Sequence, residues 1–276
     1  MSYDKSVSDH YVHGNLLNAI EVALPAIGKT IETVTIEDLA PVDEFHIGGR
    51  LATDSLLNQL NFAKQSYLLD VGCGLGGAAR YVASKYKHHV VGIDLTPEYI
   101  ETGNTLSNWL NLDDYVSLDQ GSALTMPYQD NSFDGGYMLH VGMNIDDKVS
   151  LFAEICRVLK PGSTFGIYDI MRQKDGELIY PVPWASDNST SKLSSPEHYI
   201  KALELAGFKI SQVNNRREFS LDFFKQLRVK TMSKGGPPPL GLHILMQGSA
   251  ADKVGNMVEN IKNDFISPVE IIALKV

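Results

Sequence analysis

A glycine-rich stretch decides the fold of this chain: Leu69-Asp70-Val71-Gly72-Cys73-Gly74-Leu75-Gly76-Gly77. It follows an apolar run at 67–71, which predicts a buried strand, and it precedes a helical pattern at 76–85. Glycines at a strand-to-helix turn let the backbone approach a ligand closely and present amides at the helix N-terminus. Gly72, Gly74 and Gly77 also satisfy the G-x-G-x-x-G spacing of dinucleotide sites, so the glycines alone do not select a cofactor.

Strands and helices alternate on both sides of this turn. The predicted strands lie at 67–71, 90–94, 115–119, 133–139 and 164–169. The predicted helices between them lie at 76–85, 97–110 and 147–159. Such alternation is typical of βαβ units, so we expect an α/β fold with a mostly parallel sheet and helices on both faces.

The segments outside this core have a different pattern. A helix is expected at 12–30, a mixed stretch at 31–50 that ends in a loop, and a helix at 51–60. Beyond the core we expect a proline-containing loop or lid at 171–195, helices from 196 to 207, 218–233 and 240–263, and strands at 208–213 and 269–276. We therefore divide the chain into an N-terminal helical lid segment, 1–60, and a main domain, 61–276, with an α-helical cap from insertions at about 171–195 and 216–263.

Two aspartates near the glycine turn indicate which cofactor it binds. Asp70 stands two residues before Gly72, where a carboxylate repels a pyrophosphate but accepts hydrogen bonds from an ammonium group. Asp94 ends the second strand, where its carboxylate can accept both ribose hydroxyls. The pair favours S-adenosylmethionine over a nicotinamide cofactor, against the plainer interpretation of a tight turn with a helix-capping aspartate.

The loops after the third and fourth strands are the next candidates, because ligands of such sheets bind at the carboxyl ends of the strands. Ser122 and the backbone of Ala123 can bond an adenine edge, or can form an ordinary turn. His140 is our candidate general base, since imidazole titrates near neutral pH, although a lone histidine is more often packed or merely polar. Asn144 can orient an acceptor or cap the following helix.

Several further side chains are candidates for binding the acceptor. Trp184 could form an aromatic wall for a quaternary ammonium, and an arginine could hold a carboxylate, although a surface ion pair is the plainer alternative. The candidates are His46, Arg50, Asn144, Tyr168, Arg172, Trp184 and His243.

Composition narrows the class of partner. With 24 basic and 33 acidic residues, the net charge of −9 argues against nucleic acid. Cys73 and Cys156 do not form a disulfide framework, no stretch is apolar enough for a membrane span, and no signal peptide is expected, so we expect a cytoplasmic protein. No Cys, His or Asp cluster has metal-ligand spacing, so no metal is expected. The oligomeric state is not predicted.

Five segments together resemble the class I S-adenosylmethionine-dependent methyltransferases, in the branch of the ubiquinone/menaquinone C-methyltransferases and the sarcosine/dimethylglycine or phosphoethanolamine N-methyltransferases. These segments are 68–77, 92–96, 121–127, 132–137 and 157–162. The resemblance implies a Rossmann-like seven-stranded sheet whose last strand is antiparallel. It also implies cofactor contacts from Gly72, Gly74, Asp94, Leu95, Ser122, Ala123 and the backbone of Leu139. Asp70 and Cys73 in the glycine-rich stretch complete our candidate cofactor contacts there. Many relatives have aspartate where this chain has Ser122, which weakens the expected contact with the adenine amino group.

Outside the core, 45–53 resembles the segment that closes over the cofactor in the sarcosine and phosphoethanolamine enzymes, and Tyr11 lies where those families have a lid tyrosine. The resemblance therefore adds Tyr11, Ile47 and Gly48 as cofactor contacts. The expected activity is methyl transfer from S-adenosylmethionine to a nitrogen or oxygen of a small molecule. The alternatives are a nicotinamide-dependent oxidoreductase, or a methyltransferase fold that binds cofactor without methyl transfer, such as a cyclase or regulatory module.

Overall fold

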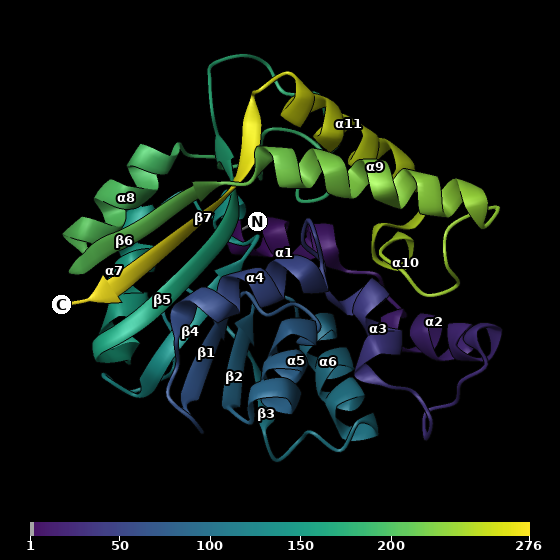
Figure 1. The fold of residues 1–276 in the computed structure, drawn as a ribbon, viewed down its shortest axis with the longest axis horizontal. Coiled ribbons are helices and arrows are strands. Elements are labelled where there is room, and N and C mark those ends of the chain that lie inside the picture. The colour runs from purple at the N-terminus through teal and green to yellow at the C-terminus, as the bar shows by residue number, and fades with distance from the viewer. Residues whose placement is uncertain (1–2) are drawn as a thin grey trace.

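The strands form one seven-stranded sheet in the order β3-β2-β1-β4-β5-β7-β6, in a computed structural model that describes residues 3–276 (Figure 1). The strands are β1 Tyr67–Val71, β2 His89–Asp94, β3 Val116–Gln120, β4 Phe133–Leu139, β5 Leu159–Arg172, β6 Phe208–Asn215 and β7 Ile266–Lys275. Neighbours among β1 to β5 are parallel, whereas β7 runs antiparallel to both β5 and β6. The predicted sheet, with its antiparallel last strand, is confirmed.

Helices cover both faces of this sheet because apolar side chains alternate along its buried strands. Leu68 packs with apolar side chains of three helices on one face, and Leu69 packs with those of two helices on the other. The first face carries α4 Arg50–Leu60, α5 Gly77–Tyr86 and α6 Pro97–Trp109. The second face carries α7 Lys148–Val158 and α8 Pro196–Leu205.

The N-terminal segment differs from the prediction. The predicted helix at 12–30 is broken into α2 Leu16–Ala23 and the 3₁₀ turn η1 Leu24–Ile27, which ends at Gly28 with a φ of 72°. Two short helices were not predicted: α1 Tyr3–Tyr11 and α3 Ile36–Asp43. A capping box between Thr35 and Asp38 begins α3.

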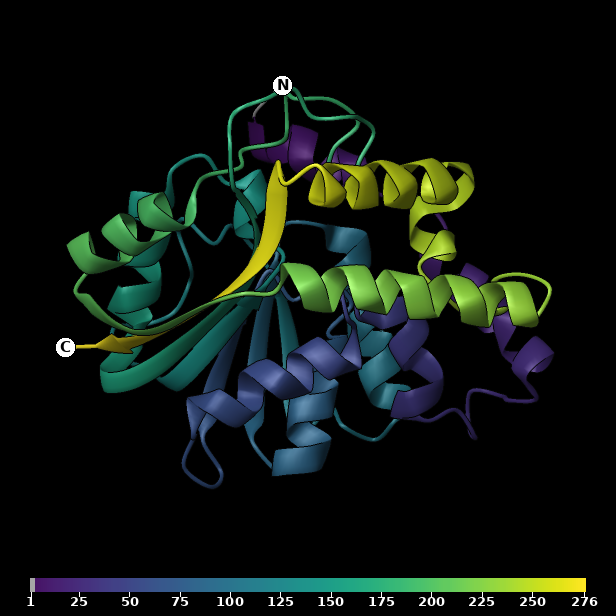
Figure 2. The same ribbon diagram turned by 45° about the horizontal axis from the view of Figure 1, so that its top comes forward.

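The C-terminal insertions form only part of the expected helical cap. The segment 216–263 contains α9 Arg217–Ser233, α10 His243–Met246, the 3₁₀ turn η3 Gln247–Ser249 and α11 Ala250–Lys262. The segment 171–195, in contrast, contains no helix, and β5 continues into it as far as Arg172. The helices α9 and α11 run side by side away from the β7 end of the sheet (Figures 1 and 2). Within residues 3–276, no helix has both the length and the apolar character that crossing a bilayer requires.

Candidate active site

A single large cavity, of about 1620 Å³, opens at the carboxyl ends of β1, β2 and β4. Its floor includes the strand-end residues Asp70, Asp94 and Leu139. Its remaining walls come from the N-terminal segment, the 3₁₀ turn η2 Gly142–Asn144 and the helices α9, α10 and α11. The cavity therefore lies where parallel α/β sheets bind their ligands.

The glycine turn forms one wall of the cavity, and its geometry requires glycine. The backbone N–H groups of Gly72 and Cys73 both donate to the carbonyl of Ile93, at 2.8 and 3.1 Å, so the turn is tied to β2. Gly72 has a φ of 68°, and a Cβ there would lie 2.3 Å from Cγ2 of Val141. Gly74 has a φ of 54°, but nothing lies closer than 4.0 Å to its Cβ position. Because Gly74 lines the cavity, a ligand can approach its backbone.

Asp70 is a buried carboxylate with an unsatisfied oxygen in the cavity wall. Only 2% of the residue is exposed, and its Oδ2 has no hydrogen-bond partner among the described residues. Burial, together with the charges of Asp94 and Glu44, raises the pKa of Asp70 to about 8, although the neighbouring hydroxyl of Tyr137 opposes the shift. A buried polar atom of this kind is normally satisfied, so the site suits a ligand that brings a donor or a positive charge.

Asp94 lies at the tip of the neighbouring strand and is held by backbone donors. Its Oδ2 accepts from the N–H of Gly74 at 3.0 Å, and its Oδ1 accepts from the N–H of Thr96 at 2.9 Å. Burial raises the pKa of Asp94, although these backbone hydrogen bonds oppose the shift. A carboxylate has about four acceptor positions, so two remain for a pair of hydroxyl groups.

The loop after β3 supplies the next part of the wall. Gly121, Ser122, Ala123 and Leu124 all line the cavity, as does Leu95 after β2. The hydroxyl of Ser122 accepts from the N–H of Leu124 at 3.4 Å, so it partly closes its own turn. The structure thus brings the predicted adenine-binding residues to the same cavity as the two aspartates.

The lid is tied to the sheet through Asn144. The hydroxyl of Tyr11 donates to Oδ1 of Asn144 at 2.8 Å, and Nδ2 of Asn144 donates to the carbonyls of Trp184 and Thr190 at 3.0 and 2.8 Å. Asn144 does not cap the following helix, because that position is taken by Asp147, whose side chain accepts from a backbone N–H. Asn144 therefore joins α1, the turn after β4 and the 171–195 loop.

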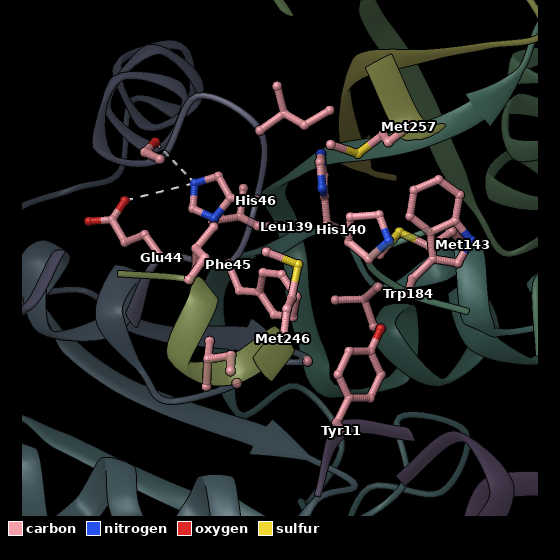
Figure 3. Close-up of a pocket in the computed structure, with 18 of the residues that line it drawn as sticks. Tyr11, Glu44, Phe45, His46, Leu139, His140, Met143, Trp184, Met246 and Met257 are labelled. Atoms are coloured by element: carbon pink, nitrogen blue, oxygen red, sulfur yellow. Dashed lines mark hydrogen bonds and ion pairs between the residues drawn. The ribbon is translucent and has the colours of Figure 1, made fainter. Parts of the chain in front are cut away.

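Two histidines meet at the centre of the cavity, with ring centroids 6.1 Å apart (Figure 3). His140 has a φ of 55°, and its Nε2 is buried and has no hydrogen-bond partner within residues 3–276. Burial, with a smaller effect of His46, holds the pKa of His140 well below its usual value. His140 is therefore a neutral imidazole at neutral pH.

The other histidine, His46, is held in one tautomer by its neighbours. Its Nε2 lies 3.0 Å from the carbonyl of Gly49 and 2.9 Å from the hydroxyl of Thr53, which itself donates to Glu44 at 2.9 Å. A carbonyl only accepts, so Nε2 of His46 carries the proton and Nδ1 keeps its lone pair. Burial lowers the pKa of His46 to about 4 and, with the charge of Asp43, raises that of Glu44 to about 7.

The predicted residues divide between the cavity wall and the shell behind it. Besides those above, Cys73, Ile47, Trp184 and His243 line the cavity. Four others lie outside the wall: Gly48, Arg50, Tyr168 and Arg172.

Each of these four has another neighbour. The Cβ position of Gly48 faces the ring of Phe219 at 2.7 Å. Arg50 pairs with Glu44 and stacks over a tyrosine ring at 4.1 Å. The Tyr168 ring is fully buried with its centroid 5.0 Å from that of His140, and Arg172 donates to a loop carbonyl.

Sequence reasoning missed much of the outer wall. Glu44 and Phe45 also line the cavity and stand directly before His46 in the sequence. Their position next to a predicted site residue could have identified them as wall residues. Tyr99, Met143, Met246 and Met257 have no comparable signal, because an apolar side chain on a helix predicts burial but not which cavity it lines. No group of three or more His, Cys, Asp or Glu side chains within residues 3–276 is arranged to hold a metal ion.

Comparison with known sequences adds a family to this geometry. Residues 69–167 match the family model described as a methyltransferase domain. A probable tocopherol O-methyltransferase of Oryza sativa subsp. japonica is 40% identical over 100 residues, 36% of this chain and 28% of the relative. A sterol 24-C-methyltransferase of Yarrowia lipolytica is 32% identical over 151 residues, 52% of this chain and 39% of the relative. The matches thus span about a third of these relatives.

Solved structures share the fold at low sequence identity. The geranyl diphosphate C-methyltransferase of Streptomyces coelicolor A3(2), solved with S-adenosyl-L-homocysteine, has a TM-score of 0.72 at 18% identity, covering 100% of this chain and 98% of its own. Phosphoethanolamine N-methyltransferase 2 of Haemonchus contortus has a TM-score of 0.73 at 20%, covering 100% and 60%. The [4+2]-cyclase SpnF has a TM-score of 0.67 at 19%, covering 99% and 96%.

Proposed function

Because this chain belongs to the class I S-adenosylmethionine-dependent methyltransferases, we propose that it transfers a methyl group from S-adenosylmethionine to a nitrogen or oxygen atom of a small-molecule acceptor. One observation carries the proposal. The unsatisfied oxygen of Asp70 and the backbone-held carboxylate of Asp94 flank the glycine turn in one cavity. Once ionised, that pair repels a diphosphate, whereas the ammonium group and the hydroxyls of a cationic nucleoside suit it.

The residues of the cavity fit this cofactor. Asp70 would accept from the ammonium group of its amino-acid part, Asp94 would bind the ribose hydroxyls, and Gly74 leaves room for the backbone approach. Ser122 and Ala123 would border the adenine. The remaining proposed contacts, Tyr11, Ile47, Cys73, Leu95 and Leu139, all line the same cavity.

When bound, the cofactor supplies a methyl group activated by a positively charged sulfur. The protein then has to hold the acceptor in line with that methyl group and exclude water. Asn144 supports exclusion of water, because it fastens the lid helix and the 171–195 loop over the cavity. His140, whose Nε2 has no hydrogen-bond partner among the described residues, is the proposed acceptor of the proton that the methyl acceptor loses, although burial lowers its pKa and so weakens it as a base.

A second candidate is a reaction without methyl transfer. The [4+2]-cyclase SpnF shares the fold over nearly the whole of both chains, so cofactor binding by itself does not establish methyl transfer. Two measurements separate the candidates. S-adenosylhomocysteine binding should be detected by calorimetry with no NADH binding, and labelled methyl should pass from S-adenosylmethionine to a member of a metabolite panel. Binding of S-adenosylhomocysteine without methyl transfer to any tested acceptor would favour the second candidate. Binding of NADH without binding of S-adenosylhomocysteine would refute both candidates.

The role of His140 has its own test. His140→Ala should abolish transfer of labelled methyl while leaving the affinity for S-adenosylhomocysteine unchanged. His46→Gln is the matched variant, since glutamine can still donate to the carbonyl of Gly49 but offers no imidazole lone pair. If His140→Ala keeps full activity and His46→Gln loses it, His46 and not His140 is the general base.

A further inference from the structure

We propose that the methyl acceptor is a large lipophilic molecule without an anionic group, bound in the part of the cavity that α9, α10 and α11 enclose. The inference rests on the proposed methyl transfer and specifies the substrate class of the same site. Three independent features of the cavity carry it: its size, the chemistry of its outer wall and the distribution of charge around it.

The cavity is too large for the cofactor alone. Its volume is about 1620 Å³, whereas a site for one drug-sized ligand is about 300–1,000 Å³. The cofactor accounts for one such ligand, at the glycine turn and the tips of β1 to β3. The remaining space, next to His140 and beneath the cap helices, is enough for a second molecule of similar or larger size.

The wall of this remaining space is apolar. Met143, Trp184 and Met257 lie beside His140, and Met246 faces them from α10 (Figure 3). The cap helices extend this wall. Its apolar side chains include Leu221, Phe224 and Met232 on α9, where Arg228 lies on the turn between the last two, and Ala250, Val254 and Val258 on α11. Methionine adapts to irregular apolar shapes, so such a wall suits a hydrocarbon body better than a polar one.

Exposed apolar side chains of α9 also line the cavity, beside the exposed cations Lys225 and Arg228 of the same helix. Leu227, Val229 and Met232 line the cavity from α9 and are 41%, 62% and 72% exposed. Large apolar side chains gathered at the rim of a cavity typically mark a site that receives an apolar ligand. The exposed part of α9 therefore continues the inner wall outward, and a long acceptor can extend along it.

The charges around the cavity disfavour an anion. Seven carboxyl groups line it, although burial raises the pKa of Asp70 to about 8 and that of Glu44 to about 7. The cationic side chains that line it, Lys225, Arg228 and Lys262, are all exposed on the cap helices. The two imidazoles at its centre are neutral, because burial lowers the pKa of both.

The cations behind the cavity wall already have partners, although Arg50 is only half-buried and its Nη2 makes no hydrogen bond among the described residues. Arg80 binds Asp43 at 2.7 Å, Arg50 binds Glu44, and Lys148 donates to two backbone carbonyls. A phosphate or carboxylate next to His140 would therefore lose its hydration without gaining a partner. The related folds that act on geranyl diphosphate and phosphoethanolamine have anionic substrates by name, and we expect this chain to differ from them.

Matched probes test the proposal by calorimetry on the full chain saturated with S-adenosylhomocysteine. Farnesol provides a neutral hydrocarbon body, farnesyl diphosphate the same body with an anionic head, and phosphoethanolamine a phosphorylated head without the body. Farnesol should bind at least about tenfold more tightly than farnesyl diphosphate, and phosphoethanolamine should not bind. Equal or tighter binding of the diphosphate, or binding of phosphoethanolamine, would overturn the proposal, as would no binding of farnesol.

Two variants check where the probe binds. Val254→Asp places a charge on the half-buried cavity face of α11 and should weaken farnesol binding by at least about tenfold. Val22→Asp is the control, because Val22 is 69% exposed on α2, away from the cavity, and its change should leave farnesol binding intact. Both variants should keep their affinity for S-adenosylhomocysteine, which also reports correct folding. Failure of that cofactor binding in the unmodified chain would refute the proposed function itself, whereas intact cofactor binding with the wrong probe preference refutes only the acceptor class.

Discussion

The unusual ionisation of Asp70 predicts that cofactor binding depends on pH. Burial raises the pKa of this carboxyl to about 8, so in the free protein Asp70 is protonated at neutral pH and below. A ligand ammonium group requires the carboxylate, and it must therefore displace the proton. The affinity for S-adenosylhomocysteine should consequently rise as the pH increases toward 8.

The size of the effect follows from linkage. Each pH unit below the pKa of the free protein costs about 1.36 kcal/mol of binding free energy, so between pH 5.5 and pH 7.5 the Kd should fall by about 100-fold. The upper limit stays below the usual pKa of an α-amino group, about 7.7–8.0, so most of the ligand is still cationic there. The stability of the free protein should change in the opposite direction. The raised pKa of Asp70 contributes stability that is present at low pH and is lost as the pH rises through about 8.

Calorimetric titrations at pH 5.5, 6.5 and 7.5, at constant ionic strength, measure the slope. Repeating them in buffers of different ionisation enthalpy counts the protons released. Asp70→Asn should bind more weakly at pH 7.5 and show a flat profile. Glu44→Gln controls for the other nearby carboxyl, whose pKa burial raises to about 7, and should keep most of the slope. A flat profile in the unmodified protein, or an unchanged slope in Asp70→Asn, would refute the role assigned to Asp70.

Three further substitutions test other parts of the site. Asp94→Ala removes two charge-assisted hydrogen bonds of about 1.5–3 kcal/mol each, so the Kd for S-adenosylhomocysteine should rise by ~10²–10⁴-fold by calorimetry, and unchanged affinity would contradict the ribose contact. Gly72→Ala, which would clash with Val141, should lower the melting temperature more than Gly74→Ala, where only backbone strain is added; equal losses would argue against the clash. Asn144→Ala removes three buried hydrogen bonds and should cost about 2–4 kcal/mol in urea unfolding, with faster proteolysis of the lid; a neutral result would exclude its role as the fastener.

The position of the glycine turn and the two aspartates in one cavity was predictable because its signals are local. A buried strand, a glycine turn and an aspartate two residues earlier lie within ten residues, and parallel pairing of β1 with β2 then brings Asp70 close to Asp94. No distant contact has to be known for this inference. The sheet was equally predictable, since each βαβ unit carries its own apolar pattern.

The remainder depends on contacts between distant parts of the chain. Tyr11 and Asn144 are separated by 133 positions, and neither sequence neighbourhood indicates the other. The tautomer of His46 is set by a backbone carbonyl and a threonine hydroxyl, which become neighbours only when the turn before α4 forms. Likewise, helical periodicity predicted α9 but not that one of its faces would line a cavity.

The family match covers the part of the cavity around the glycine turn but not the cap helices. The matched segment, 69–167, contains the glycine turn, Asp94, the loops after β3 and β4 and His140, so it includes most of the proposed cofactor residues. The proposed acceptor wall comes from the cap helices between 217 and 262, outside that segment. Relatives can therefore keep the same cofactor half while their cap helices select different acceptors. For this chain, the substrate has to be inferred from α9, α10 and α11, where methionines and aromatic rings surround a space without buried cations.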